Sequence, residues 1–557
     1  MKGNGIALVQ PRPHCHGSVT TGADSASTMV SPDQRTLHRP PLLSRRLVIG
    51  GAAAATALLS IGARGPASLP PGLFSLGVAS GDPDAGSVIL WTRLAPEPMA
   101  GDGGMPPVAV PVRWEVAEDE GFARVVRSGT ARAEPHWGHA VHVEAGGLRP
   151  GRAYYYRFIA GGEASPVGRT KTAPAAGAMA ERLRLCFASC QKYEAGFYAA
   201  WRHVVAEDPD LILFLGDYIY EGAPSHKDAV RQHRNPDPFD LAGYRIRYAT
   251  YKLDPLLQAA HHAAPWALTW DDHEVANDYA GALDQGNGDP ATFLRRRAAA
   301  YQAYYEHQPL RVRPPRGADM RIYRTLDWGA LAQLQIVDDR QYRGPHACQP
   351  AGLIEAHKPY ASVIGDCADL QDPARSMLGR EQERWLDDRL ARTPAQWNIL
   401  AQQTLMRQAV VSPPEGPDGG PRYSADNWSG YPQARERIFR RWVEAGTSNP
   451  LALGGDIHAF AAADIMDPDR PDGSPIAAEF VGGSITSLRP DPDFKRLAPA
   501  NGLRFAENEV RGYGRLDIDA RGGTVTYRGL ADARREDSGI ADIARFAVED
   551  KKPGLHV

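Results

Sequence analysis

Four apolar runs of the chain each end abruptly in residues that can bind a metal ion. The runs are residues 183–187, 211–215, 267–270 and 451–453. The polar residues that follow them are Cys190, Asp217, Tyr220, Asp271, Asp272, His273, Glu274, Asn277, Asp456 and His458. A single Asp after a strand usually caps the next helix, and Asp217 by itself would be interpreted in that way. So many costly polar groups at strand ends need a common partner, because buried charges must be paired or bound to metal. The sequence therefore predicts a metal site.

The four apolar runs predict strands that are buried on both faces of a sheet, because polar residues do not alternate within them. In layered α/β folds, ligand-binding groups lie just past the carboxyl ends of such strands. Helical patterns fall between the runs, for example at 293–305 and 380–390. Tyr301, Tyr304 and Tyr305 share one helical face, which we expect in the core. This part of the chain is predicted to be an α/β domain that carries the chemistry.

A different pattern precedes the linker at 172–177. Short alternating segments are separated by turn-forming residues, and they lie at 87–94, 110–116, 139–145 and 153–160. Short strands at such spacing predict an all-β sandwich, and residues 148–158 look like the late-strand signature of fibronectin type III modules. His136, His139 and His142 are spaced by three, which does not suit a strand, so we expect surface or turn residues rather than ligands.

Length and charge limit the class of protein. The chain has 557 residues and is 43% apolar, which is enough for a sizeable core and more than one domain. Its net charge of -3 gives no reason to expect a nucleic-acid partner or an anionic membrane. Residues 1–63 are basic overall, and residues 1–44 lack any apolar period, which is typical of a disordered leader.

The end of this leader resembles an export signal. Arg45 and Arg46 precede an uncharged, Ala- and Gly-rich run at 47–63, as in twin-arginine signal peptides. The alternative is a membrane anchor, but this run is short and its Ala and Gly partition poorly into lipid. We therefore expect the twin-arginine translocation machinery as a partner, a periplasmic or secreted location, and no stable membrane anchor. Met29 is an alternative start of the chain.

Cysteine usage agrees with export. Cys348 and Cys367 flank a short loop that has turn-forming residues at both ends. In an oxidising compartment they are predicted to form a disulfide, although two separate thiols are the alternative that spacing alone does not exclude.

The order of the polar clusters resembles a known family. The blocks are Cys190, Gly216-Asp217-x-x-Tyr220, Asp271-Asp272-His273-Glu274 with Asn277, and Gly455-Asp456-x-His458. They are similar to those of the PhoD-like alkaline phosphatases, within the calcineurin-like and purple-acid-phosphatase-like metallophosphoesterase superfamily. Residues 74–83 and 338–343 extend the resemblance, which runs from about residue 74 to about residue 530.

The resemblance implies a fold and a division of the chain. An N-terminal all-β sandwich of fibronectin III or immunoglobulin type would be followed by a four-layer αββα metallophosphoesterase domain. The expected parts are a leader at 1–63, the sandwich at 64–173, the catalytic domain at 180–535 and a C-terminal tail at 536–557.

The resemblance also implies metal ligands. Asp217 would bridge two metals, and Cys190, Tyr220 and His458 would bind Fe3+. Asp272, Asn277 and Asp456 would bind Ca2+; whether Asp271 or Asp272 is the ligand stays open, although alignment with the superfamily pattern favours Asp272. Other divalent metals such as Zn2+, Mn2+ or Mg2+ are the alternative cofactors.

The remaining site residues are expected to contact the substrate. His273 stands where the superfamily places a phosphate-contacting histidine, or it orients Asp217 instead. Among Arg295, Arg296 and Arg297, the resemblance favours Arg297 as the phosphate clamp, with a solvated charge run as the alternative. Trp428 and Tyr431 lie in a loop-rich stretch and are expected at the pocket rim, against the organic part of the ester.

These expectations define an exported phosphatase of small-molecule phosphate esters. Two metals would support direct attack of water on monoesters and also diesters, with no phosphoenzyme. A phospholipase D-like or nucleotide phosphodiesterase of the same fold is one alternative. An exported binding or adhesion module with an inert metal site is the alternative that is not an enzyme.

The export signal gives the first testable prediction. Replacing Arg45 and Arg46 together with Lys should leave folded precursor in the cytoplasm, because the translocation machinery recognises the paired arginines. Cell fractionation followed by immunoblotting measures this. Unchanged delivery of the double variant to the periplasm or medium would contradict the assignment.

Overall fold

The structure is a computed structural model that describes residues 69–222, 229–353, 355–412, 420–488 and 492–556. The expected leader and its expected twin-arginine signal lie outside these residues. Among the residues that the structure describes, no helix has both the length and the apolar composition that a membrane crossing requires.

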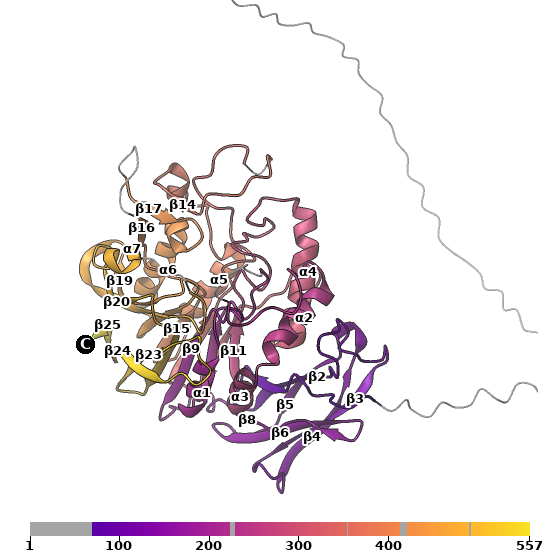
Figure 1. The fold of residues 1–557 in the computed structure, drawn as a ribbon. Coiled ribbons are helices and arrows are strands. Elements are labelled where there is room, and N and C mark those ends of the chain that lie inside the picture. Colours follow the sequence, from indigo (N-terminus) through magenta and orange to yellow (C-terminus); the bar gives the residue numbers. More distant parts are fainter. Residues whose placement is uncertain (1–68, 223–228, 354, 413–419, 489–491, 557) are drawn as a thin grey trace, which may run out of the picture. The chain divides into compact units, whose positions relative to one another are not determined.

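Two large sheets dominate the structure (Figure 1). The ten-stranded sheet has the order β25 (Lys552–His556), β24 (Ile540–Glu549), β23 (Gly522–Leu530), β22 (Gly512–Ile518), β9 (Leu183–Ala188), β10 (Leu211–Leu215), β11 (Trp266–Thr269), β1 (Val78–Gly81), β2 (Ser87–Arg93), β5 (Ala140–Gly146). The seven-stranded sheet has the order β12 (Arg324–Trp328), β13 (Ala332–Ile336), β15 (Trp397–Ala401), β18 (Pro450–Gly454), β20 (Arg470–Gly482), β19 (Phe460–Asp467), β21 (Leu503–Glu507). The four apolar runs are β9, β10, β11 and β18, so the prediction of buried strands is confirmed.

The core explains why these strands are apolar on both faces. Leu211, Leu213 and Leu215 of β10 pack between the two sheets, whereas Ile212 and Phe214 point to the opposite face. That outer face is covered by α1 (Ala199–Ala206), α2 (Leu241–Lys252), α3 (Pro255–Ala263) and α4 (Pro290–His307). The outer face of the seven-stranded sheet is covered by α5 (Gly379–Leu390) and α6 (Pro432–Ala445). Because each central strand lies between two apolar layers, it has no polar face.

An Asp cap followed by a Pro marks the start of both α3 and α4. Asp289 caps α4 by accepting hydrogen bonds from two backbone N–H groups, and Pro290 occupies the first turn. Asp254 and Pro255 start α3 in the same way. On α4, Tyr301 and Tyr304 are buried and Tyr305 packs against them, so the predicted core face is confirmed.

The N-terminal strands form a second layer on part of the large sheet. A five-stranded sheet contains β4 (Val125–Ala133), β3 (Val110–Ala117), β6 (Ala153–Ala160), β7 (Glu163–Ala164) and β8 (Gly168–Lys171). Its side chains pack on those of β2 and β5 in one apolar cluster. The strands β1, β2 and β5 belong to the ten-stranded sheet, however, because β1 pairs with β11. The N-terminal sandwich was expected to be separate, but it shares a sheet with the α/β part. The alternation of residues within one segment does not show which strand that segment pairs with.

The three N-terminal histidines do not meet one another. His142 Nε2 lies 2.9 Å from the carbonyl oxygen of Gln308, and His139 Nε2 lies 3.0 Å from that of Val108. His136 belongs to a short 3-10 turn at Pro135–Trp137. The expectation of surface or turn residues holds for His136 and for His139, which lies in a turn although it is buried, but it is wrong for His142, which lies in β5.

The last residues of the chain are part of the sheet. Residues 536–557 were expected to be a tail, but they contain β24 and β25, which extend the ten-stranded sheet beyond β23. The alternation of small and apolar residues along β24 is weak, and this explains why the sequence did not reveal the strand.

Cys348 and Cys367 are joined by a disulfide, as predicted. The segment between them contains β14 (Val363–Ile364), which pairs with β17 (Arg422–Ser424); β17 also pairs with β16 (Val410–Ser412). We use the name disulfide segment for residues 348–367. The two remaining described cysteines, Cys186 and Cys190, are free and buried.

The disulfide gives the second prediction. Replacing Cys348→Ser and Cys367→Ser together should lower the free energy of unfolding by about 3 kcal/mol, because the closed loop restrains the unfolded chain. Denaturant titration of the purified, oxidised protein measures the change. Reductant should destabilise the parent protein and leave the double variant unchanged. Two freely alkylated thiols in the parent protein would contradict the prediction.

Candidate metal centre

The loops that follow β9, β10, β11 and β18 bring acidic, thiol and imidazole groups together. Among the described residues, three groups of side chains could hold a metal ion, and within each group the ligand atoms lie within 4.8 Å of one another. They are Cys190, Asp217 and His458; Asp217, Asp272 and His273; and Asp271, Asp272 and Asp456. Asp217 is common to the first two groups, and Asp272 is common to the last two. The residues that the sequence grouped by strand end are thus contiguous in space.

The backbone turns sharply at four of these residues. Cys190, Asp217, Asp456 and His458 have φ angles of 58°, 58°, 62° and 56°. This left-handed region costs a residue with a side chain about 1–2 kcal/mol, and such strain gathers at functional sites. The turn directs each side chain back over the end of its strand. Gly216 is required beside Asp217, because a Cβ there would lie 2.4 Å from the Cβ of Asp271.

Glu274 ties two of the loops together. Its carboxylate accepts hydrogen bonds from the backbone N–H groups of Asp271 at 2.8 Å and Asp217 at 3.1 Å, and also from that of Tyr218. Burial raises the pKa of Glu274 to about 7. The side chain is therefore a structural link between the loops after β10 and β11.

Tyr220 adds a phenol to the first group. Its hydroxyl donates to Asp217 Oδ2 at 2.7 Å and lies 2.9 Å from His458 Nε2. Ser487 donates to the same hydroxyl at 2.8 Å. Tyr220 was predicted from its spacing to Asp217, and the structure places it against two members of the group.

The electrostatics of this cluster favour a bound cation. Burial, and then the neighbouring carboxylate of Asp217, raise the pKa values of Cys190 and Tyr220 well above their ordinary range. Burial and the nearby Asp272 also raise the pKa of Asp217. Without a compensating cation these groups would retain their protons, whereas metal binding replaces the protons with positive charge.

Unpartnered oxygens agree with this interpretation. Among the described residues, Asp217 Oδ1, Asp271 Oδ2 and Asp272 Oδ1 are buried and have no hydrogen-bond partner. Leaving a buried carboxylate oxygen without a partner is costly. Oxygen, nitrogen and sulfur donors at this spacing therefore fit metal ions, and the residues present are suitable ligands.

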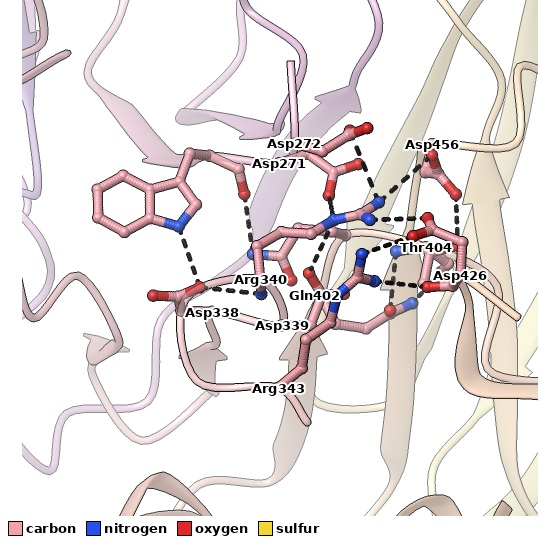
Figure 2. Close-up of polar contacts among 12 residues, drawn as sticks. Asp271, Asp272, Asp338, Asp339, Arg340, Arg343, Gln402, Thr404, Asp426 and Asp456 are labelled. Carbon is pink, nitrogen blue, oxygen red and sulfur yellow. Dashed lines mark hydrogen bonds and ion pairs between the residues drawn. The ribbon is translucent and has the colours of Figure 1, made fainter. Parts of the chain in front are cut away.

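An arginine that the sequence did not single out lies among the carboxylates. Figure 2 shows the guanidinium of Arg340 between Asp271, Asp272 and Asp456, with Asp426 on its other side. Nε pairs with Asp271, Nη1 donates to Asp426 at 2.7 Å, and Nη2 lies 3.6 Å from both Asp272 and Asp456. Among the described residues Nη2 has no hydrogen-bond partner. Arg340 lies in the stretch at 338–343 that extends the family resemblance, but the sequence alone assigned no role to that stretch.

Arg297 does not take the position expected of a phosphate clamp. Its Nε donates to the carbonyl oxygen of Ala318 at 3.0 Å, and its Nη1 donates to that of Gly281. The guanidinium therefore fixes two loops. The resemblance that favoured Arg297 does not reveal which loops pack against its helix.

Trp428 and Tyr431 are not at a pocket rim. Both are 0% exposed, and they pack in the core under α6. Trp428 Nε1 donates to Gln402 at 2.9 Å and the Tyr431 hydroxyl to the Gly344 carbonyl at 2.6 Å. A stretch rich in Gly and Pro was expected to be a loop, but its second half leads directly into the 3-10 turn Trp428–Gly430 and α6.

His273 and Asn277 lie on one turn against Glu221. His273 Nδ1 is 2.6 Å from Glu221 Oε2, and the backbone N–H of Asn277 donates to Glu221 Oε1 at 2.7 Å. Burial by itself lowers the pKa of His273, but Glu221 and the nearby aspartates outweigh it and raise the pKa well above its ordinary value. Glu221 was not predicted, although it directly follows Tyr220.

The chain is similar to known proteins along most of its length. Residues 185–527 match the family described as PhoD-like phosphatase, and residues 62–174 match its N-terminal domain. Over 494 residues the chain is 43% identical to Alkaline phosphatase D of Bacillus subtilis (strain 168), covering 86% of this chain and 82% of that protein. A solved structure of PhoD is 42% identical, with a TM-score of 0.81 over 87% of this chain and 91% of the other.

Asp217 gives the third prediction. Asp217→Asn keeps the shape of the side chain but removes a negative charge that two of the groups share, so bound metal should fall sharply at both. Elemental analysis of the purified, folded variant measures the loss. Asp464→Asn, at a carboxylate that pairs with Arg504, is the charge-matched control and should retain metal. Full metal occupancy in Asp217→Asn would mean that Asp217 is only a structural turn residue.

Proposed function

Because the chain belongs to the PhoD-like phosphatase family, we propose that it is an exported, metal-dependent phosphatase of small phosphate esters. It hydrolyses monoesters, and also diesters, by attack of water on phosphorus. The observation that carries the proposal is the set of three adjoining ligand groups linked through Asp217 and Asp272. Such an arrangement suits adjacent cations that share carboxylates.

The donors divide into two kinds of metal site. Cys190, Tyr220 and His458 offer a thiolate, a phenolate and an imidazole, which together would suit Fe3+. Asp217, which belongs to two of the ligand groups, would help to hold both this metal and the next one. Asp272, Asn277 and Asp456 offer oxygen atoms, which suit Ca2+. Zn2+, Mn2+ or Mg2+ at these positions is the alternative that the experiment below distinguishes.

Asp272 is a better ligand than Asp271 in this proposal. Asp272 belongs to two of the ligand groups and its Oδ1 is unpartnered among the described residues. Asp271 uses Oδ1 to pair with Arg340 Nε. We therefore assign Asp271 the role of orienting the arginine.

Arg340 replaces Arg297 as the proposed phosphate clamp. Its Nη2 faces the ligand groups without a hydrogen bond, so it can donate to a phosphoryl oxygen. His273 is held through Nδ1 by Glu221, which leaves Nε2 to contact the ester or its leaving group. Bound metal ions would lower the pKa of water and neutralise charge on the phosphoryl group. No protein nucleophile is required, and no phosphoenzyme should form.

The finer description of the fold and of export belongs to the same proposal. The placement of helices outside two packed sheets supports a four-layer αββα catalytic domain, which starts near residue 180 and continues through β25. The two N-terminal layers support an immunoglobulin- or fibronectin-like domain at 64–173. The disulfide supports an oxidising location, periplasmic or secreted, which the twin-arginine signal would provide.

Metal identity and turnover give the fourth prediction. Fe3+ bound by phenolate and thiolate should absorb visible light by charge transfer, so the purified protein should be coloured. Tyr220→Phe should shift or abolish the band, whereas Tyr305→Phe, on α4 far along the chain, should leave it unchanged. Absorption spectra, elemental analysis and assays with monoester and diester substrates are measured on the same samples.

The outcomes separate metal identity from function. A calcium chelator should remove activity before colour, because Ca2+ is held only by exchangeable oxygen ligands. A colourless, active enzyme without iron would refute the Fe3+ assignment and leave the phosphatase proposal intact. Absence of turnover on all esters, in protein with full metal occupancy, would refute the proposed function.

A further inference from the structure

Arg340 has two carboxylate anchors, and they differ in kind. Asp271, which pairs with Nε, also belongs to one of the three metal-ligand groups. Asp426, which accepts from Nη1 at 2.7 Å, belongs to none of them. Although Asp272 is the proposed ligand, a cation in that group would lie close to the Asp271 carboxylate and attract it. Asp426 is therefore the anchor that does not compete with metal.

Asp426 also binds a second arginine that is itself fixed. Arg343 Nη2 donates to Asp426 Oδ1 at 2.6 Å. The same guanidinium donates to the carbonyl oxygens of Tyr279 at 2.8 Å and Asp426 at 2.7 Å. Because Arg343 is held by main-chain atoms, it gives the Asp426 carboxylate a fixed position. Figure 2 shows both arginines converging on this side chain.

The disulfide segment holds the backbone that carries Asp426. In β14, Val363 pairs with Ser424 and Ile364 with Tyr423 of β17. The N–H of Ala425 donates to the carbonyl oxygen of Ser362 at 2.9 Å. Ala425 and Tyr360 also belong to one small apolar cluster that includes both disulfide cysteines. The residue directly before Asp426 is thus fastened to the disulfide segment.

His346 also contacts the Asp426 carboxylate. His346 Nε2 lies 3.3 Å from Asp426 Oδ1, and its ring stacks on that of Tyr360 with centroids 3.6 Å apart and planes at 5°. Tyr360 lies within the disulfide segment. Asp426 is therefore enclosed by Arg340, Arg343 and His346, and its carboxylate has little freedom to move.

We propose that Asp426 is a positioning residue: it holds Arg340 with Nη2 directed at the ligand groups, and the disulfide segment keeps Asp426 in place. The inference rests on the proposed function, since it assigns Arg340 to the phosphoryl group. Asp426 acts through Arg340 and does not touch the substrate. Its loss should weaken binding of phosphate and its esters without removing metal.

The experiment compares Asp426→Asn and Asp426→Glu with the parent enzyme, all at saturating metal. Asp426→Asn should raise KM for a monoester, and the inhibition constant of inorganic phosphate, by about 10–100-fold, as loss of supporting hydrogen bonds does around metal sites. Metal content should stay at the parent value. Asp426→Glu keeps the charge and should recover part of the loss. The double serine variant of Cys348 and Cys367 should shift both constants in the same direction.

A matched control separates positioning from general destabilisation. Glu306 is 0% exposed and pairs with Arg245 at 2.6 Å, so Glu306→Gln removes a buried carboxylate–arginine pair with the same change of charge. Thermal unfolding should show that both variants are folded and less stable. Only the Asp426 variants should change KM and the phosphate inhibition constant.

The possible failures are distinguishable. Unchanged KM and phosphate inhibition in folded Asp426→Asn would overturn the inference, as would a loss of metal like that expected for Asp217→Asn. Equal kinetic changes in Glu306→Gln would also overturn it. Absence of turnover in the parent enzyme would instead refute the proposed function.

Discussion

The structure depends on the neutralisation of negative charge that is buried at one place. Asp217, Asp271, Asp272, Asp426 and Asp456 all lie in or beside the candidate metal centre, and burial is the largest cause that raises the pKa values of Asp217, Asp271 and Asp456. A chain can bury so many carboxylates only by pairing them or by binding cations. Arg340 and Arg343 pair with Asp426, which holds its pKa well below the ordinary range although burial alone would raise it. Arg340 also pairs with Asp271 and lies 3.6 Å from both Asp272 and Asp456, but one guanidinium does not neutralise three carboxylates, so negative charge remains for metal.

The backbone around the centre follows from this requirement. Parallel strands bring their carboxyl ends to one edge, and left-handed residues after the strands turn the side chains back over that edge. Close approach of the loops requires Gly216, and Glu274 links them through three backbone N–H groups. Glu274 therefore has a structural role, unlike the candidate ligand Asp272, although both residues occur in the same short block of sequence. Rigid loops hold the donors close together before a cation arrives, which reduces the entropy lost on binding.

What the sequence could reveal was local. Cys190, Asp217, Tyr220, Asp272, Asp456 and His458 could be predicted because each follows an apolar run at a characteristic spacing, and the run itself indicates a buried strand. Arg340 and Asp426 could not be chosen in the same way, because they come from segments 86 residues apart and acquire their roles only through contact with each other. Arg297 was favoured by the family resemblance, yet its guanidinium donates to carbonyl groups of two loops. Trp428 and Tyr431 were judged by the composition of their stretch, which does not report burial.

The N-terminal strands also contribute to the geometry of the centre. In the ten-stranded sheet β11 carries the block Asp271–Glu274 at its end, and β1 covers the edge that β11 would otherwise expose. The N–H of Asp82, just after β1, donates to the Trp266 carbonyl at 2.9 Å. Arg324 then joins Asp82 to the Leu268 carbonyl, at 2.6 and 3.1 Å. An uncovered edge strand is free to fray or to pair wrongly. Strand β1 therefore supports the strand that leads to Asp272, a residue common to two of the ligand groups, and the N-terminal strands contribute to the geometry of the candidate metal centre without supplying one of its residues.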